Sequence, residues 1–336
     1  MSGIADVALR AGVSKSTASR ALSGAGHTSE RTRARVLAAA NELGYVPSTN
    51  AVSLATGRTR NIGVVMPCVN RWFFAEVLEG IQATLLASGY DLTLYDAKPG
   101  SPARARVFAE FLARKRFDGL IAVGVEPIDD EIGQLKSIGR PIVNIVGAHD
   151  QPGVVGIDDV RAAKRATEHL LGLGHRDIVF LGAGDADVWA NVDRLRLEGY
   201  QAAMSDAGLT SAARHVPSPV TLPGGYAAAV DLLSDDGRPT AILAVCDEVA
   251  IGTLTAARRL GIAVPASLSV VGIDDHEFAE MFALTTLKQE PREQGALAAR
   301  VLLDTLQHPD SPTLIEPMPA RLIVRNSTAS LDPSQN

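Results

Sequence analysis

The stretch ADVALRAGVSKSTASRAL, residues 5–22, decides the fold at the amino-terminal end of this chain. Its apolar side chains recur three and four residues apart, which is the spacing of one helical face, until Gly12 interrupts the pattern. Ser14 then offers a side-chain oxygen to the free amides of a new helix. The stretch therefore predicts a helix, a tight turn and a second, short helix.

The second predicted helix has two different faces. Ala18, Ala21 and Leu22 form an apolar face. The opposite face is polar and basic, with Lys15, Ser16, Ser19 and Arg20. Because Ala8 and Ala18 are small, the two helices can cross closely, as a helix-turn-helix must before its second helix enters a major groove. An ordinary helical hairpin with a solvated polar face is the alternative.

The composition is that of a soluble globular protein with several domains. The chain has 336 residues, 46% of them hydrophobic, which predicts two or three domains. We find no apolar signal run and no stretch near the roughly twenty apolar residues of a membrane span, so we expect a cytoplasmic protein without membrane contact. Cys68 and Cys246 lie far apart without metal-type spacing, so neither a metal site nor a disulfide framework is expected.

Charge is distributed unevenly along the chain. The overall formal charge is −6, but residues 1–60 contain eight Lys and Arg against three Asp and Glu. The remaining residues contain 24 basic and 35 acidic side chains. This asymmetry favours a basic DNA-binding head on an acidic body that DNA repels.

Two further segments follow the second helix. Ser29 can cap a third helix, whose apolar face includes Leu37 and which ends at Gly44. The segment STNAVSLAT, residues 48–56, is either a bare linker or a helix whose apolar face is too small to be stable in water. Leu54 is long enough to act as an apolar wedge between base pairs in a minor groove.

From residue 62 onward, short apolar runs alternate with helical patterns. We predict strands at 62–66, 92–95, 119–125, 142–146, 154–157, 178–183, 242–246 and 268–273. We predict helices at 74–87, 102–114, 160–173, 194–207, 226–233, 248–260 and 292–307. This alternation is typical of a doubly wound α/β fold, whose ligands bind at the carboxyl ends of the strands. About eight such units exceed one sheet of the usual size, so we expect two similar lobes around a cleft.

Scarce aromatic residues point to this cleft. Only 4% of the residues are aromatic. Trp72 and Phe73 follow the first predicted strand of the body, and Trp189 and Tyr226 precede helices of its second half. Flat rings suit the C–H faces of a sugar or a stacked purine, and they equally suit a hydrophobic core.

Polar residues near the later strands complete the candidate cleft. Asp274, in VVGIDD, is expected to accept hydrogen bonds from ligand hydroxyls. Asp247 either has the same role or caps the helix that follows it. Gln289 lies in the segment LTTLKQE between the predicted lobes and is a further candidate.

Several strings of this sequence, in their order and spacing, resemble the LacI/GalR family of bacterial transcriptional regulators. They are ADVALRAGVSKSTASRALSG, TSERTRARVLAAANELGYVP, IGVVMP, EHLLGLGHRDIVFL, RLRLEGYQAAM, PTAILAVCDEVAIG, VPASLSVVGIDD, LTTLKQEPREQGALAARVLL and RLIVRNST. Together they extend over nearly the whole chain. The resemblance implies an all-α helix-turn-helix headpiece, a hinge helix, a two-lobed α/β effector domain like periplasmic sugar-binding proteins, and a homodimer on a near-palindromic DNA operator.

The resemblance also implies the domain limits. We expect the headpiece at 1–47, the hinge helix and linker at 48–60, the effector-binding and dimerisation domain at 61–330, and a short tail at 331–336. Within the large domain, lobe 1 is expected at about 61–158 and 290–318, and lobe 2 at about 159–289 and 319–330.

The resemblance assigns functional residues to both parts. Lys15, Ser16 and Arg20 are expected to contact bases, and Arg20 can pair bidentately with a guanine. Residues placed for phosphates or the groove wall are Ser14, Thr17, Ser19, Ser23, His27, Ser29 and Tyr45. Leu54, with Ala51 beside it, matches the minor-groove lever of the family. Arg196 matches an arginine of the effector site, where a guanidinium can donate to two ligand oxygens.

Enzymes with a similar fold carry motifs that this sequence lacks. Residues 182–185, GAGD, lack the third glycine of a dinucleotide site, and neither G-x-S-x-G nor H-E-x-x-H occurs. We therefore expect no enzymatic activity, no catalytic residues and no cofactor. A transport solute-binding protein shares the body fold but would need an export signal and no basic head.

The sequence therefore predicts a dimeric DNA-binding regulator, a repressor, whose operator affinity is set by a small carbohydrate. A maltose-type α-glucoside is the candidate effector, and a purine or another metabolite is the alternative. The sequence leaves open whether the effector is an inducer or a corepressor.

Overall fold

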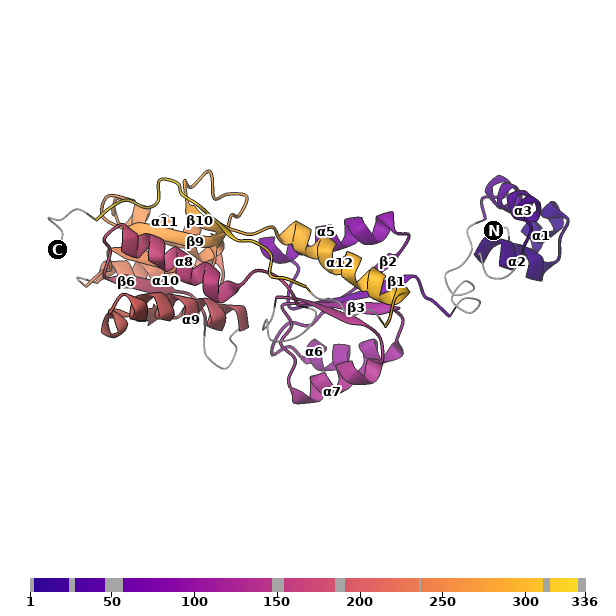
Figure 1. The fold of residues 1–336 in the computed structure, drawn as a ribbon, viewed down its shortest axis with the longest axis horizontal. Helices are drawn as coiled ribbons and strands as arrows, with labels where there is room; N and C mark the ends of the chain where they lie inside the picture. The colour runs from indigo at the N-terminus through magenta and orange to yellow at the C-terminus, as the bar shows by residue number, and fades with distance from the viewer. Residues whose placement is uncertain are drawn as a thin grey trace.

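The computed structural model describes residues 3–23, 28–45, 57–146, 154–184, 191–235, 237–310 and 315–331. Along the chain, these residues form a bundle of three helices and then two lobes, each built on its own sheet. Figure 1 shows the three parts in a row along the longest axis, with the helical bundle beyond the first lobe. This architecture is the predicted fold class, a helical headpiece followed by a two-lobed α/β body.

Short polar residues fix the ends of the helices in the amino-terminal bundle. The helices are α1 (Ile4–Ala11), α2 (Lys15–Ser23) and α3 (Glu30–Glu42). Gly12 ends α1 with φ at 64°, a left-handed conformation that glycine adopts without steric cost. Ser14 Oγ accepts a hydrogen bond from the Thr17 amide at 3.1 Å. Ser29 Oγ accepts one from the Thr32 amide at 3.3 Å, so both predicted helix caps are confirmed.

Alanine dominates the core of this bundle. The buried residues are Val7, Ala8, Ala11, Ala18, Ala21, Val36, Ala39 and Ala40. Such small side chains let the three helices approach closely. The expectation for Leu37 is wrong: it is 44% exposed, because α3 turns the face with Ala39 toward the core. Arg35 of α3 donates to the Ala11 carbonyl at 2.7 Å and so ties α3 to the end of α1.

Five parallel strands make the sheet of the first lobe. In spatial order they are β2 (Asp91–Asp96), β1 (Asn61–Met66), β3 (Gly119–Val123), β4 (Ile142–Ile145) and β5 (Val154–Val155). Successive side chains of a strand point to opposite faces. Val64 of β1 packs with α5 (Trp72–Ala87) and α12 (Pro291–Gln307), whereas its neighbour Val65 packs with Phe108 on the other face. The first lobe is therefore a three-layer sandwich.

The layer behind Val65 contains helices that the sequence predicts only in part. The helix predicted at 102–114 is observed as α6 (Pro102–Arg106), a π-helical turn (Val107–Phe111) and a 3₁₀ turn (Leu112–Arg114). The helix α7 (Asp129–Ile138) is absent from the prediction, because its buried positions include only one apolar residue, Ile138. Acidic residues in its first turn suit the positive end of the helix dipole.

Six strands make the sheet of the second lobe. In spatial order they are β11 (Arg321–Ile323), β10 (Thr285–Lys288), β9 (Ser269–Asp274), β8 (Ala241–Ala244), β6 (Ile178–Leu181) and β7 (Arg214–Val216). All neighbouring pairs are parallel except β10 and β11. The prediction lacks β7, β10 and β11, because each is only three or four residues long and carries polar side chains.

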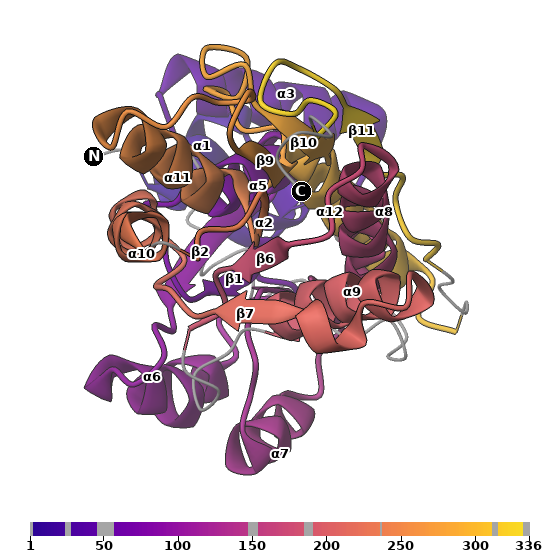
Figure 2. The ribbon, with the colours of Figure 1, turned by 90° about the vertical axis from the view of Figure 1, so that its left-hand side faces the viewer.

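Four helices cover the second sheet in two pairs. They are α8 (Asp159–Gly172), α9 (Asn191–Asp206), α10 (Leu222–Ser234) and α11 (Asp247–Arg259). Figure 2 shows α8 and α9 on one side of the sheet and α10 and α11 on the other. Their apolar faces enclose a core that includes Phe180 and Tyr200.

Glycine residues allow α5 and α12 to touch. A Cβ added to Gly80 of α5 would lie 1.9 Å from the Arg292 carbonyl oxygen. A Cβ added to Gly295 of α12 would lie 2.1 Å from the Val77 carbonyl oxygen. Both distances are impossible for a real side chain, so α12 is docked on α5 through backbone contact. The first lobe therefore includes a helix from far along the chain.

Three segments connect the two lobes. The chain passes from β5 to α8, returns from β10 to α12, and crosses again before β11 (Figure 1). Ile157 and Met318 pair across the first and third of these segments. The Met318 amide donates to the Gly156 carbonyl at 2.8 Å. The connections thus support one another between the lobes.

Candidate functional site

The outer face of α2 is polar and has no bulky apolar side chain. Its exposed residues are Lys15, Ser16 and Arg20, Ser14 is exposed just before it, and Thr17, Ser19 and Ser23 are half-buried. The opposite face, with Ala18 and Ala21, is buried in the bundle. Because the inner face of α2 is held by packing in the bundle, its outer face has a fixed orientation. A helix of this kind can approach the floor of a major groove, where Lys15 and Arg20 supply positive charge.

Arg20 is held along its own helix. Its Nε donates to the Ser16 carbonyl at 3.3 Å. Among the described residues, no hydrogen bond engages its two terminal NH₂ groups. These groups are the ones that donate in parallel to O6 and N7 of a guanine. The arrangement of Arg20 therefore suits direct recognition of a base.

The other predicted DNA contacts lie in several environments. Ser23 is half-buried at the end of α2, Ser29 caps α3, and Tyr45 is half-buried against the core of the bundle. The side chains of Ser29 and Tyr45 therefore also hold the bundle together. His27, Ala51 and Leu54 lie outside the described residues.

In the body, side chains from the two lobes meet near the carboxyl ends of the strands. Arg71 precedes α5 in lobe 1, and its Nε donates to Glu248 of α11 in lobe 2 at 2.9 Å. The rings of Trp72 in lobe 1 and His276 in lobe 2 have centroids 4.9 Å apart. An ion pair and a ring contact thus connect lobe 1 with lobe 2.

Arg196 of α9 lies at the centre of a buried charge network. Its Nε donates to Asp159 at 2.9 Å, and one terminal nitrogen donates to the Val245 carbonyl at 2.7 Å. The other terminal nitrogen lies 3.8 Å from an Asp274 oxygen. Burial lowers the pKa of Arg196, but the charges of Asp159 and Asp274 outweigh it, so the pKa is raised. The guanidinium is therefore permanently charged and fixed in direction.

A chain of polar groups leads from Asp274 to the connection between the lobes. Gln294 of α12 donates to Gln289 at 2.8 Å, and Gln289 donates to Asp274 at 2.6 Å. All three side chains are buried. Because Gln294 belongs to lobe 1 and Asp274 to lobe 2, this chain links the geometry around Arg196 to the position of the lobes.

Asp247 holds two strand ends together. Its Oδ2 accepts from the His276 amide at 2.9 Å, and its Oδ1 accepts from the Thr286 hydroxyl at 2.7 Å. A Cβ on Gly272 would lie 2.1 Å from Oδ1, so the carboxylate needs glycine there. The capping alternative for Asp247 is wrong, because Cys246 occupies the cap position of α11. Burial and the neighbouring Asp274 raise the pKa of Asp247.

Several residues at these strand ends have a strained backbone. Val146 after β4 has φ at 62°, Ala183 after β6 has φ at 54°, and Asp274 at the end of β9 has φ at 140°. A β-branched residue such as valine rarely adopts a positive φ, so surrounding contacts must hold it there. Such strain gathers at ligand sites. We call the following residues the interlobe site: Arg71, Trp72, Asp159, Asp193, Arg196, Asp247, Glu248, Asp274, His276 and Gln289.

The predicted aromatic residues separate in the structure. Trp72 belongs to the interlobe site, where its ring packs against that of His276. Phe73 meets Phe74 edge to face, with centroids 5.5 Å apart, and packs against the core of lobe 1. Tyr226 packs against the core of lobe 2 and accepts a hydrogen bond from Arg259. Trp189 lies outside the described residues.

Sequence reasoning missed half of the interlobe site. The missed residues are Arg71, Asp159, Asp193, Glu248 and His276. Asp159 had a usable signal, the acidic pair that follows β5. Asp158 caps α8 by accepting from the Arg161 amide at 2.9 Å, which leaves Asp159 to face Arg196. Arg71 and Glu248 gave no such signal, because each acquires its partner only from the other lobe.

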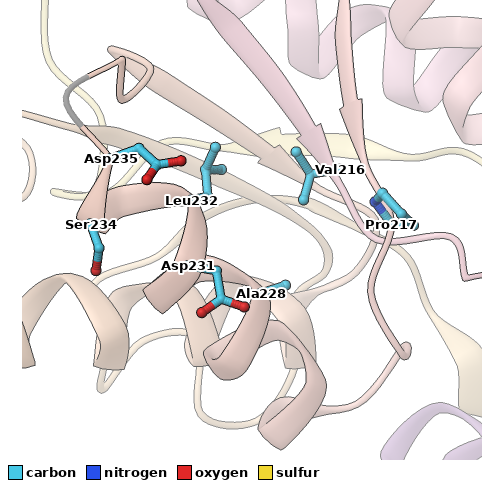
Figure 3. Close-up of a pocket in the computed structure, with 7 residues that line it drawn as sticks. All are labelled: Val216, Pro217, Ala228, Asp231, Leu232, Ser234 and Asp235. Atoms are coloured by element: carbon cyan, nitrogen blue, oxygen red, sulfur yellow. The ribbon is translucent and has the colours of Figure 1, made fainter.

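A separate hollow lies in lobe 2 between the end of β7 and α10 (Figure 3). Its volume is about 530 Å³, and it is lined by Val216, Pro217, Ala228, Asp231, Leu232, Ser234 and Asp235. Both of its acidic residues are exposed, so water already solvates them. The interlobe site, with buried polar groups that converge, is the stronger candidate for a ligand.

Two features are absent from the part of the chain that the structure describes. None of its helices is long and apolar enough to cross a membrane. None of its His, Cys, Asp and Glu side chains gather in threes as a metal ion requires.

Together, the helix-turn-helix surface and the two-lobed body define the class of DNA-binding proteins that respond to a small ligand. Residues 3–48 match the bacterial regulatory proteins of the lacI family. Residues 167–328 match the periplasmic binding protein-like domain. The two matches fall on the helical bundle and on most of the second lobe with α12.

Relatives extend the match to the full chain. The HTH-type transcriptional regulator DegA of Bacillus subtilis (strain 168) is 33% identical over 98% of both chains. The HTH-type transcriptional repressor PurR of Proteus mirabilis (strain HI4320) is 34% identical, over 98% of this chain and 97% of the relative. The chain belongs to the LacI family of bacterial regulatory proteins. It is a DNA-binding transcriptional regulator with an effector-binding body, as the sequence predicts.

Solved structures agree with this assignment. The lac repressor dimer bound to operator and the anti-inducer ONPF has a TM-score of 0.84 at 27% identity, covering 98% of this chain and 99% of that one. The regulator CelR in complex with cellobiose has a TM-score of 0.69 at 27% identity, covering 97% and 100%. A LacI-family regulator from Enterococcus faecium with bound ribose has a TM-score of 0.72 at 28% identity, covering 81% and 100%.

Proposed function

We propose that this chain is a repressor that binds a near-palindromic operator as a homodimer in the cytoplasm, and that it has no enzymatic activity. A small carbohydrate bound at the interlobe site changes its affinity for the operator. The observation that carries the proposal is the outer face of α2, where Lys15, Ser16 and Arg20 are exposed on a helix whose other face is buried.

The DNA-binding part is tested by selecting sites from random DNA and measuring affinity for the selected operator and for random duplex. Arg20→Ala should lower the preference for operator by about 1–3 kcal/mol, because a bidentate contact to guanine is lost. The matched control is Arg238→Ala, which removes an exposed arginine of lobe 2. An equal loss on both DNAs would show that Arg20 contacts phosphate instead.

The resemblance places the hinge at 48–60 and gives Leu54 the role of a minor-groove wedge. If both hinge segments of a dimer insert Leu54, Leu54→Ala should weaken operator binding. Ligand affinity and the melting of the body should stay the same, because the change lies outside both lobes. Unchanged operator affinity would count against the hinge mechanism.

A carbohydrate is supported by the groups at the interlobe site. Asp274 and Gln289 offer polar atoms suited to hydroxyls, and Trp72 offers a flat ring. Ribose and cellobiose are the ligands named for two related structures. A maltose-type α-glucoside is our specific candidate, and either sign of regulation fits the geometry.

The effector is identified by thermal-shift measurements of the full-length protein with sugars and nucleobases. Gln289→Ala should lower the affinity for the active compound, because Gln289 orients Asp274. The control is Asp231→Asn in the separate hollow, which should bind as the natural protein does. Stabilisation by a purine and by no sugar would replace the carbohydrate with a purine effector.

A homodimer is supported by apolar side chains exposed beside β9. Phe278, Met281 and Phe282 are 44%, 80% and 40% exposed, and they lie within one turn region. Contiguous exposed apolar residues mark interaction surfaces. In sedimentation experiments, Met281→Asp should convert the dimer to monomer and weaken operator binding, whereas Val324→Asp on another exposed residue should not. A dimer that survives Met281→Asp would place the interface elsewhere.

A further inference from the structure

Asp193 is a buried carboxylate without a partner. It lies in the first turn of α9 and is only 7% exposed. Among the described residues it has no hydrogen bond and no ion pair. Neither carboxylate oxygen of Asp193 is fully enclosed, because neither is among the enclosed side-chain atoms that lack a hydrogen bond. Both oxygens therefore keep some contact with solvent. A buried charge that is left unpaired is costly, so a residue of this kind points to a missing ligand group.

The charged side chains around Asp193 do not provide a partner for its carboxylate. The positive groups that face it are Arg196 and Arg71. Arg196 is already bonded to Asp159 and Arg71 to Glu248. The other groups facing Asp193 are carboxylates, Asp159 and Asp274.

The opposite lobe adds a further carboxylate. Glu126 follows β3 of lobe 1 and accepts a hydrogen bond from the Asn191 amide, two residues before Asp193. The charges of Arg194 and Arg104 also reach Glu126, but Arg194 is bonded to Glu198 and Arg104 to Glu131. Partial burial and the charge of Asp193 raise the pKa of Glu126 to about 7. Because Arg196, Arg71, Arg194 and Arg104 are each bonded to another carboxylate, Asp193 and Glu126 add negative charge that no described cation matches.

We propose that Asp193 determines effector specificity by binding a protonated amine, so that the effector is an amine-bearing polyol such as an amino sugar. The inference rests on the proposed ligand role of the interlobe site and narrows its carbohydrate to a cationic one. A neutral hydroxyl can donate to Asp193 but leaves the excess charge in place, and a phosphate or carboxylate would be repelled. An ammonium group donates and also neutralises.

The same contact would favour approach of the two lobes. Asp193 belongs to lobe 2 and Glu126 to lobe 1, and the charge of Asp193 raises the pKa of Glu126. A cation beside Asp193 reduces this repulsion. Ligand binding and approach of the lobes would therefore support each other, as two states with different ligand affinity require.

The test compares pairs of compounds in which an amine replaces a hydroxyl or, for Tris, a hydroxymethyl group. Titration calorimetry of the full-length protein at pH 7 uses glucosamine against glucose, galactosamine against galactose, and protonated Tris against pentaerythritol. At least one amine should bind about tenfold or more tightly than its hydroxyl twin, because a hydrogen bond to a charged group is added. Asp193→Asn should reduce that ratio to about twofold or less. Asp206→Asn, an exposed acid at the end of the same helix, should leave it unchanged.

Several results would overturn the amine proposal. They are equal binding of both twins, an amine preference that survives Asp193→Asn, and no binding by any amine in the panel. Operator binding by the same samples separates this failure from failure of the proposed function. If a neutral sugar changes operator affinity equally in the natural protein and in Asp193→Asn, the proposed regulatory function stands and the amine-bearing effector is ruled out. The amide of the variant has nearly the shape of the carboxylate, so the variant is expected to fold. Circular dichroism checks that it does.

Discussion

The helical bundle and the interlobe site are built in opposite ways. The outer face of α2 comes from one short run of residues, and its side chains are exposed and have few partners. The interlobe site takes Arg71 from the start of α5, Arg196 from α9 and Asp274 from β9. Its polar groups are mostly buried and bonded to one another. The outer face of α2 is therefore formed locally and its side chains have few contacts. The interlobe site is formed by distant segments and its side chains are held by many contacts.

This difference separates function from stability in the two regions. An exposed side chain such as Arg20 contributes little to folding, so its substitution is expected to act mainly on DNA recognition. A buried group such as Arg196 is needed by its partners whether or not a ligand is bound. Substitutions in the interlobe site should therefore change the stability of the body as well as the response to ligand.

The largest effect is expected from Arg196→Met. It leaves Asp159 buried without its cation, which should cost about 3–5 kcal/mol of the free energy of unfolding of the body. Urea denaturation followed by tryptophan fluorescence measures this loss. The control Arg238→Met, at an exposed position, should change stability by less than about 0.5 kcal/mol. Equal stability of both variants would mean that the network around Arg196 is solvated.

A pH-dependent effect is expected from Asp193→Asn. Burial and the charges of Asp159 and Asp274 raise the pKa of Asp193 to about 6, although Arg196 and Arg71 lower it. A carboxyl group with a raised folded-state pKa stabilises the protein below the unfolded-state pKa of about 4, and that contribution is lost as the pH rises through about 6. The variant should match the natural protein below about pH 4 and exceed it by about 3 kcal/mol at pH 7.

Denaturation of both proteins across this pH range, without ligand, measures the effect on Asp193. A constant difference at all pH values would show that Asp193 does not titrate in this window. Asp206→Asn serves as the control, because Asp206 is an exposed group paired with Lys164 at the surface.

A smaller, local effect is expected from Ala18→Leu in the bundle. The larger side chain does not fit between α1 and α3, and overpacking costs about 1–3 kcal/mol. A small bundle with an alanine core has little stability to lose, so operator binding should fall sharply. Calorimetry should find the transition of the body unchanged. Ala38→Leu, at an exposed position of α3, should leave both properties as they are.

The smallest effect is expected from Glu248→Gln. The pair of Arg71 and Glu248 is partly open to solvent, with side chains 28% and 17% exposed. Its loss should cost no more than about 1 kcal/mol, because partly solvated ion pairs contribute little. A cost similar to that of Arg196→Met would place this pair with the rigid network instead. Thermal unfolding of the natural protein and the variant distinguishes the two results.

The sequence by itself determined the parts in which neighbours along the chain are also neighbours in space. Gly12, Ser14 and Ser29 mark the ends of the helices in the bundle, because helix caps need only local hydrogen bonds. The long apolar strands of both sheets were also predicted, because a run of apolar residues is a pattern among neighbours along the chain. Arg196 was found by resemblance and not by any local pattern.

Tertiary structure alone decided which polar groups meet. The short strands β10 and β11 and the helix α7 form because of the elements beside them, and their own residues predict them weakly. Arg71 pairs with Glu248, and Asp193 stays unpaired, only because two lobes are brought together. Burial and charge pairing depend on distance in space, and a sequence records distance along the chain. The helix-turn-helix surface was therefore predicted from the chain, whereas the acidic character of the interlobe site was not.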